Sequence, residues 1–104
     1  GHNNVINDVV NETLDLDKAV GIALKYAVED GNTLIIVTAD HETGGLSVLR
    51  GNPGKATLTG VFSTGDHSAV MVPVFAYGPG AEEFRGIYNN TEVFDKICKL
   101  LLKK

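Results

Sequence analysis

The 104 residues can form one small domain or part of a larger one, and a hydrophobic content of 43% is enough to support a core. The net charge of -4 and the absence of a Lys/Arg cluster argue against nucleic acid or an anionic membrane surface as the main partner. No apolar run approaches the roughly 20 residues that cross a bilayer, so the sequence predicts no membrane span.

The first third of the chain contains two apolar patterns with helical spacing. Residues 1–14 predict a short helix with one buried face, because apolar residues recur there at helical intervals. From Asp15 a second pattern extends to Val28, and Asp15 or Asp17 can cap this second helix. Gly31 follows, which is typical of a helix end.

A run of apolar, mostly β-branched residues from Leu34 to Val37 predicts a buried strand. Runs without polar alternation are expected where helices cover both faces of a parallel sheet, so the helix-then-strand order favours an α/β fold. Asp40 and His41 follow this strand, and in such sheets ligands gather beyond the carboxyl ends of the strands. A turn at Gly44 and the next glycine would let both side chains serve one site.

The middle of the chain predicts a β-hairpin. Residues 46–49 and 56–63 have the composition of two short strands, and residues 50–54 that of a turn. A polar loop over residues 63–68 then places His67 just before another apolar run.

Two further elements are expected in the last third. Residues 72–77 predict a strand, and Pro73 suits its start. Asn90 or Thr91 can cap a final helix. The apolar residues on its inner side are Val93, Phe94, Ile97, Leu100 and Leu101.

The three histidines, His2, His41 and His67, lie in loop-like positions beside glycine or an acid, outside the apolar stripes. Imidazole and carboxylate groups are usual ligands of zinc and similar ions, and a fold can assemble such ligands from distant loops. Each histidine taken singly is also compatible with an ordinary surface loop. The Asp40-His41 pair is the best placed, because it ends a strand.

Other polar side chains favour structural roles. The Ser and Thr residues near the histidine loops do not lie in a strand-turn-helix elbow, so they predict turn residues rather than a nucleophile. Asp66 either orients the His67 ring or caps its loop. Arg50 and Arg85 are expected to be solvated, and the single cysteine, Cys98, is expected to be a small core residue.

Residues 33–45 have the sequence TLIIVTADHETGG, which closely resembles the metal-binding segment of bacterial alkaline phosphatases. Flanking landmarks resemble the same family in order: GHNN at 1–4, ETLDLDKA at 12–19, GDH at 65–67 and VFAYGPGA at 74–81. The resemblance implies a three-layer α/β sandwich, with a mostly parallel sheet flanked by helices plus a β-hairpin. It also implies that residues 1–104 are a carboxyl-terminal fragment of that domain.

The resemblance implies a metal-dependent phosphomonoesterase that uses two zinc ions and a nearby magnesium. In this family a serine attacks the phosphate monoester and forms a phosphoserine intermediate, which water then hydrolyses. By position, Asp40 and His41 would ligate one zinc, on the serine side. His2 and His67 would belong to the second zinc, on the leaving-group side.

Several family residues lie upstream of the resembling part. They are the nucleophilic serine, the magnesium-binding acid, the arginine that binds phosphate, and an aspartate four residues before His2. The chain begins at Gly1 without an initiator Met or a secretory signal pattern, which indicates a processed or cut chain. We expect the isolated chain to supply zinc ligands but no catalytic nucleophile, and to lack substantial phosphatase activity. Family habit implies a homodimer in the periplasm or outside the cell.

Two alternatives stay open. Phosphoglycerate mutases and phosphopentomutases of the same superfamily also end a strand in Asp-His, but they typically continue with a Gly-Asn pattern, whereas residues 42–45 here are Glu-Thr-Gly-Gly. The other alternative is a noncatalytic scaffold that binds one metal through Asp40, His41 and His67. A cut sheet would leave apolar faces uncovered, so the isolated chain is expected to associate with itself.

Overall fold

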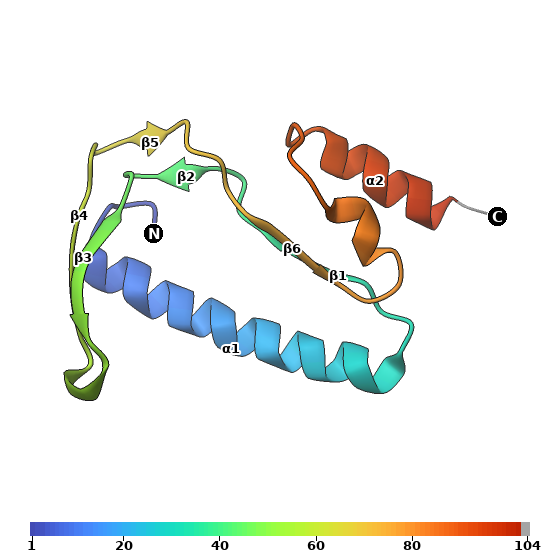
Figure 1. The fold of residues 1–104 in the computed structure, drawn as a ribbon, viewed down its shortest axis with the longest axis horizontal. Coiled ribbons are helices and arrows are strands. Elements are labelled where there is room, and N and C mark those ends of the chain that lie inside the picture. Colours follow the sequence, from blue (N-terminus) through green and yellow to red (C-terminus); the bar gives the residue numbers. More distant parts are fainter. Residues whose placement is uncertain (103–104) are drawn as a thin grey trace. The chain divides into compact units, whose positions relative to one another are not determined.

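The computed structural model describes residues 1–102 and contains two α-helices, two short 3-10 helices and six strands (Figure 1). Their order is α1 (Ile6–Asp30), β1 (Ile35–Thr38), β2 (Glu42–Thr43), β3 (Ser47–Asn52), η1 (Pro53–Lys55), β4 (Thr57–Val61), β5 (His67–Ser68), β6 (Val74–Tyr77), η2 (Ala81–Phe84) and α2 (Glu92–Leu101). The chain divides into two compact units. Unit 1 contains Gly1–Lys18 and His41–Val72, and unit 2 contains Ala19–Asp40 and the residues from Pro73 onward.

The two helices predicted for the first third are one continuous helix, α1, of 25 residues. The prediction of a boundary near Asp15 and Asp17 was wrong, because both residues lie inside the helix and are exposed to solvent. Lys18 Nζ donates a hydrogen bond to the Asp15 carboxylate at 3.0 Å, so Asp15 forms an exposed ion pair one turn along the helix instead of a cap. None of the helices described in residues 1–102 is long and apolar enough to span a membrane.

The end of α1 is as predicted. Gly31 has a φ of +68°, the left-handed conformation that closes many helices, and its N–H donates to the carbonyl of Ala27 at 2.9 Å. The Asp30 carboxylate accepts hydrogen bonds from the Asn32 N–H at 3.1 Å and from the Thr33 hydroxyl at 2.7 Å. These bonds turn the chain directly into β1.

Unit 2 contains an antiparallel pair of strands, β1 and β6, with Ile35 opposite Tyr77 and Thr38 opposite Val74. The strands predicted at Leu34–Val37 and at residues 72–77 are confirmed, with shifted boundaries. The expected parallel pairing is not present in the described residues, because each pair within residues 1–102 is antiparallel. The chain between β1 and β6 contains only short strands and a hairpin, not the helical crossover that a parallel pair requires.

The β1–β6 pair has one covered face and one open face. Along β6, half-buried Val74 and Ala76 alternate with Phe75 and Tyr77, which are 65% and 45% exposed. Within residues 1–102, the only buried apolar side chains are Ala27 and Phe84. A large part of the apolar surface of this unit is therefore open to contact with further protein.

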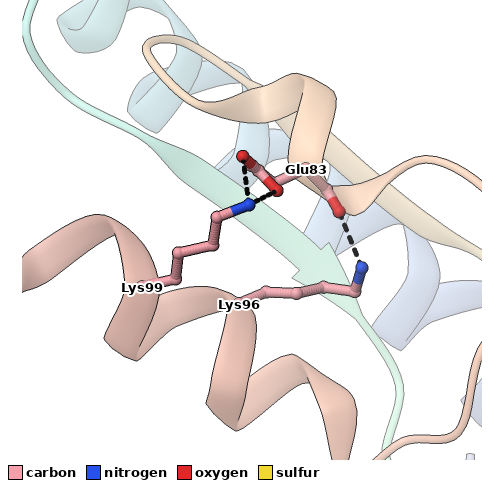
Figure 2. A network of polar contacts seen from close by, with 3 residues as sticks. All are labelled: Glu83, Lys96 and Lys99. Carbon is pink, nitrogen blue, oxygen red and sulfur yellow. Dashed lines mark hydrogen bonds and ion pairs between the residues drawn. The ribbon is translucent and has the colours of Figure 1, made fainter. Parts of the chain in front are cut away.

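The unpredicted helix η2 is fastened to α2 by a cluster of polar contacts around Glu83 (Figure 2). Lys99 Nζ lies 2.8 and 2.7 Å from the two carboxylate oxygens of Glu83. Lys96 Nζ donates to the backbone carbonyl of Glu83 at 2.8 Å and lies 4.2 Å from the centroid of the Tyr88 ring. A cation over an aromatic face adds to the attachment.

The start of α2 differs in detail from the prediction. Thr91 is the N-cap residue, but its side chain makes no capping hydrogen bond. Instead, Glu92 in the first turn accepts a hydrogen bond from the Asn89 N–H at 3.0 Å. Cys98 lies on this helix and is half-buried, so the expectation of a core position is only partly met.

The hairpin predicted for unit 1 is confirmed as the antiparallel pair β3–β4. Its turn lies later than predicted, at η1. Asn52 caps this short helix, because its side-chain oxygen accepts a hydrogen bond from the Lys55 N–H at 3.1 Å. Ala56 ends the turn in the left-handed conformation, with φ +49°. Nearly all residues of both strands are exposed.

Candidate metal centre

The three histidines of the chain lie in unit 1, on three segments that are distant in sequence. His2 lies in the turn before α1, His41 directly precedes β2, and His67 is the first residue of β5. The strands β2 and β5 form a short antiparallel pair in which Thr43 lies opposite His67 and Glu42 lies opposite Ser68. This pair was not predicted, because two residues per strand carry no detectable alternation.

The three imidazole rings meet beside this strand pair. The centroids of the His41 and His67 rings are 3.8 Å apart, and their planes differ by 27°, so the rings are stacked. The His2 ring meets the His67 ring edge to face, with centroids 5.3 Å apart and planes at 75°. All three side chains are solvent-exposed. Unit 1 thus gathers three nitrogen-bearing rings at one accessible place.

The His41 ring is oriented by the backbone of the next residue, Glu42. Nδ1 of His41 lies 2.9 Å from the carbonyl oxygen of Glu42, and because a carbonyl can only accept, Nδ1 is the donor. In a neutral ring the lone pair then resides on Nε2. Histidines that bind metals commonly donate their second nitrogen to a backbone carbonyl in this way, which fixes the tautomer and the direction of the ring.

Asp66 caps its loop rather than orienting the His67 ring. Its carboxylate accepts a hydrogen bond from the His67 backbone N–H at 2.8 Å. The Asp66 N–H donates in turn to the hydroxyl of Thr64 at 3.2 Å. Of the two roles left open by the sequence, the loop cap is the one observed, and Thr64 has the turn role predicted for the hydroxyl residues.

Asn4 joins the His2 segment to the other two. Its side-chain oxygen accepts a hydrogen bond from the Thr43 hydroxyl at 3.2 Å, and its Nδ2 donates to the backbone carbonyl of Thr64 at 3.5 Å. Asn4 has a φ of +52°, a left-handed conformation that asparagine tolerates better than most residues. This role was not predicted from the sequence, because the partners of Asn4 are distant along the chain.

Gly44 allows the close approach of these segments. Its N–H donates to the carbonyl of Asp66 at 2.9 Å, and its carbonyl accepts from the Ser63 N–H at 2.8 Å. It has a φ of +77°, and a Cβ atom at this position would lie 2.4 Å from the side-chain oxygen of Asn4 and 2.5 Å from the Phe62 ring. Only glycine fits this position without displacing neighbouring atoms.

Glu42 connects β2 to β5 through its side chain. One carboxylate oxygen accepts a hydrogen bond from the Gly45 N–H at 2.7 Å, and the other contacts the Ser68 hydroxyl. The hydrogen bond from Ser68, followed by backbone N–H groups that include that of Gly45, lowers the pKa of Glu42 from its ordinary value despite partial burial, which would raise it. Glu42 is therefore a carboxylate at neutral pH. In the sequence, Glu42 is recognisable only as part of the segment after His41.

Asp40, the fourth predicted ligand, belongs to unit 2. It is exposed, follows β1 and is joined to His41 by a peptide bond. Among residues 1–102, the rings and acids do not form a group of three or more His, Cys, Asp or Glu that converges as a ready metal site. The histidine rings stack on one another instead. The donor chemistry nevertheless fits zinc, which favours imidazole nitrogen and carboxylate oxygen.

A cavity of about 280 Å³ in unit 2 lies against β6 and η2. Its lining residues are Val74, Ala76, Ala81, Glu82, Phe84, Arg85 and Gly86. The lining contains no histidine, so the cavity is separate from the predicted ligands. Arg85 is exposed, as predicted.

The alkaline phosphatase family profile, described as "Alkaline phosphatase", matches residues 1–59 and 54–102. The alkaline phosphatase from the Antarctic bacterium TAB5 is 50% identical to this chain and superimposes with a TM-score of 0.85, covering 96% of this chain and 31% of that one. A mutant of the TAB5 enzyme solved with Mg bound in the M3 site is 49% identical, with a TM-score of 0.82 over 96% of this chain and 32% of that one.

A further relative is the streptomycin-6-phosphate phosphatase of Streptomyces griseus, which is 36% identical over 109 aligned residues, 88% of this chain and 24% of the relative. The chain therefore spans between 24% and 32% of the lengths of the TAB5 and Streptomyces griseus proteins. The family match favours the phosphatases over the mutases of the same superfamily. The two matched ranges together cover residues 1–102 and the α/β architecture agrees, so this chain belongs to the alkaline phosphatase family.

Proposed function

We propose that this chain is the carboxyl-terminal, zinc-binding part of an alkaline phosphatase domain that hydrolyses phosphate monoesters through a phosphoserine intermediate. The observation that carries the proposal is the meeting of the His2, His41 and His67 rings from three separate segments, with centroids 5.3 and 3.8 Å apart. Three imidazoles that come from separate segments and meet at one exposed place offer nitrogen donors of the kind that zinc binds.

In this proposal Asp40 and His41 hold one zinc ion, and His2 and His67 belong to a second. When bound, such a pair of ions lowers the pKa of the attacking oxygen and stabilises the leaving oxygen of the phosphate ester. The residues of this chain orient the donors. The backbone carbonyl of Glu42 fixes the tautomer of His41, and Asp66 fixes the loop that carries His67.

The remaining parts of the reaction are assigned to protein outside these residues. They include the serine nucleophile, the arginine that binds phosphate and the acid that holds magnesium. The TAB5 mutant with bound Mg supports the inclusion of magnesium. The name of the Streptomyces griseus relative refers to a phosphate ester, which supports the substrate class.

The proposal extends to the assembly. The rest of the domain would cover the open face of β1–β6, which carries Phe75 and Tyr77, and would add the parallel strands that complete the sheet. Contact between two copies of the complete protein would give a homodimer. A periplasmic or secreted location is proposed on the same family grounds. Without the covering protein, exposed apolar surface of this extent favours self-association of the isolated chain.

Zinc titration of the 104-residue chain tests the proposed ligands. Calorimetry is expected to show zinc binding with proton release, because imidazoles must be neutral to bind. His41→Ala and His67→Ala are each expected to weaken binding by at least about 10-fold, the lower end of the losses seen for mutations around metal sites. Asp40→Asn is also expected to weaken zinc binding. Asp15→Asn, which changes an exposed acid on α1, is the control and is expected to leave zinc affinity unchanged. Equal zinc affinity in the wild type and both histidine variants would contradict the proposal and favour the noncatalytic scaffold.

A second experiment tests whether the serine nucleophile lies in protein outside these residues. The purified chain, supplied with zinc and magnesium, is expected not to hydrolyse an aryl phosphate. Hydrolysis that co-purifies with the 104-residue chain would overturn the proposal that the nucleophile lies outside these residues. The same assay with a complementary amino-terminal part of the TAB5 enzyme is expected to restore hydrolysis if that part associates with this chain.

A further inference from the structure

We propose that Glu42 is a positioning residue, whose carboxylate holds β2 in register with β5 and thereby holds the His41 and His67 rings face to face. The inference rests on the proposed function for its biological meaning, because the rings matter as zinc ligands. Its structural content is independent of zinc. It concerns a side chain between two proposed ligands that is not itself proposed to bind the metal.

The β2–β5 pair needs a side-chain contact that fixes its register, and we call the contacts of Glu42 with Ser68 and Gly45 the clamp. Each of β2 and β5 has only two residues, so the backbone ladder is too short to fix its own register. A slip of one residue would turn His67 to the opposite face of the strand, away from His41. The observed stack, with centroids 3.8 Å apart, requires the pairing in which Thr43 faces His67.

The geometry of Glu42 suits this role. It lies directly opposite Ser68 in the pair, and one of its carboxylate oxygens contacts the Ser68 hydroxyl. Its other oxygen accepts the Gly45 N–H at 2.7 Å, which closes the turn that follows β2. One half-buried side chain therefore fixes both β5, the strand that carries His67, and the turn that follows β2.

The clamp depends on the ability of the Glu42 side chain to form two hydrogen bonds. A carboxylate can only accept hydrogen bonds, and both of its partners here are donors. Glutamine has the same shape and can keep both contacts, because its oxygen accepts the Gly45 N–H while its amide donates to the Ser68 oxygen. Alanine can keep neither. Positioning by shape and hydrogen bonding is thus separable from any direct action of the negative charge.

The experiment compares the full 104-residue chain with Glu42→Ala, Glu42→Gln and Ser68→Ala, and uses Glu29→Ala on the exposed end of α1 as control. The metal-free readout is the nuclear Overhauser contact between the ring protons of His41 and His67. It is expected in the wild type, Glu42→Gln and Glu29→Ala. It is expected to be lost in Glu42→Ala and weakened in Ser68→Ala.

The second readout is zinc affinity by calorimetry. Glu42→Ala is expected to weaken binding by about 10- to 100-fold, as for other residues that orient metal ligands, with Glu42→Gln within about 3-fold of the wild type. Ser68→Ala, the milder change, tests the clamp if Glu42→Ala does not fold. An intact ring contact in Ser68→Ala and in folded Glu42→Ala would overturn the inference. Equal losses in Glu42→Gln and Glu42→Ala would also overturn it, because charge would then be the cause.

The two proposals fail separately in these measurements. If no form of the chain binds zinc but Glu42→Ala loses the ring contact, the metal assignment fails and the positioning role stands. If zinc binds through the histidines and all Glu42 variants retain both ring contact and affinity, the metal assignment stands and the positioning role fails.

Discussion

The two strand pairs of unit 1 are stabilised in different ways. The β3–β4 hairpin has strands of six and five residues, with nearly all residues exposed. The β2–β5 pair has two residues per strand, yet it carries His67 and is fastened by the side chains of Asn4 and Glu42. The longer pair has a backbone ladder over five residue pairs, whereas the shorter pair has only two and is fastened by particular side chains. Substituting single side chains should therefore affect the shorter pair far more than the longer one.

The family match agrees with this contrast. The two matched segments overlap at residues 54–59, in the turn and second strand of the hairpin, whereas the segments around the histidines are matched without a break. Exposed hairpin tips are where insertions and deletions are tolerated best. Matched glycine and asparagine substitutions in the two pairs test this contrast directly.

The largest effect is expected from a glycine exchange. Gly44→Ala should destabilise the fold by roughly 2 kcal/mol or more, since the new Cβ would lie 2.4 Å from the Asn4 side chain at a φ of +77°. Gly51→Ala in β3 is the matched control, because its Cβ would meet Thr57 at an ordinary 3.5 Å. Urea denaturation followed by circular dichroism measures both. Equal losses would remove the distinction between the two pairs.

The next largest effect concerns two asparagines. Asn4→Ala should cost about 1–2 kcal/mol, because it removes two hydrogen bonds and leaves alanine in a left-handed conformation. Asn52→Ala removes only the cap of η1 and should cost roughly 0.5 kcal/mol. The same denaturation experiment measures both. The His2 ring signals should shift in Asn4→Ala and stay in place in Asn52→Ala. The reverse pattern would contradict the role of Asn4 in joining the His2 segment to the other two.

Predictability from sequence differs in the same way. The apolar run of β1 and the hairpin were predicted because their signals are local. The antiparallel pairing of β1 with β6 was not, since an apolar run records burial and not strand direction. The merging of two predicted helices into α1 was missed because an interior aspartate resembles a cap until its partner, Lys18, is known.

The candidate site shows the same limit. The residue types of His2, His41 and His67 indicated metal chemistry, and the family resemblance proposed how they are grouped. Asn4 and Glu42 were missed because their partners lie 39 and 26 residues away, at Thr43 and Ser68. Contacts of this kind have no periodic signature. The side chains that hold a site together are therefore harder to predict than the side chains that carry its chemistry.

A smaller and opposite effect is expected at the hairpin turn. Ala56 has a φ of +49°, where glycine is free of the strain that a Cβ causes. Ala56→Gly should therefore stabilise the fold by about 0.5 kcal/mol, after allowing for the greater flexibility of glycine in the unfolded chain. Zinc affinity should be unchanged. A loss of zinc affinity in this variant would show that the hairpin and the histidine segments are coupled.

The smallest effect is a pH dependence in the shorter pair. The Ser68 hydroxyl and neighbouring N–H groups lower the pKa of Glu42 below its ordinary value of 4.5. A carboxyl whose pKa is lowered on folding stabilises the protein above its unfolded pKa, and this contribution is lost as the pH falls through the folded pKa. The difference in thermal midpoint between the wild type and Glu42→Gln should therefore change only below pH 4.5. Glu29→Gln controls for the change in net charge. A difference that stays constant down to the acid unfolding transition would mean that Glu42 acts in the clamp through its shape alone, and the hydrogen bonds to Ser68 and Gly45 would then be no stronger for the charged acceptor than for a neutral one.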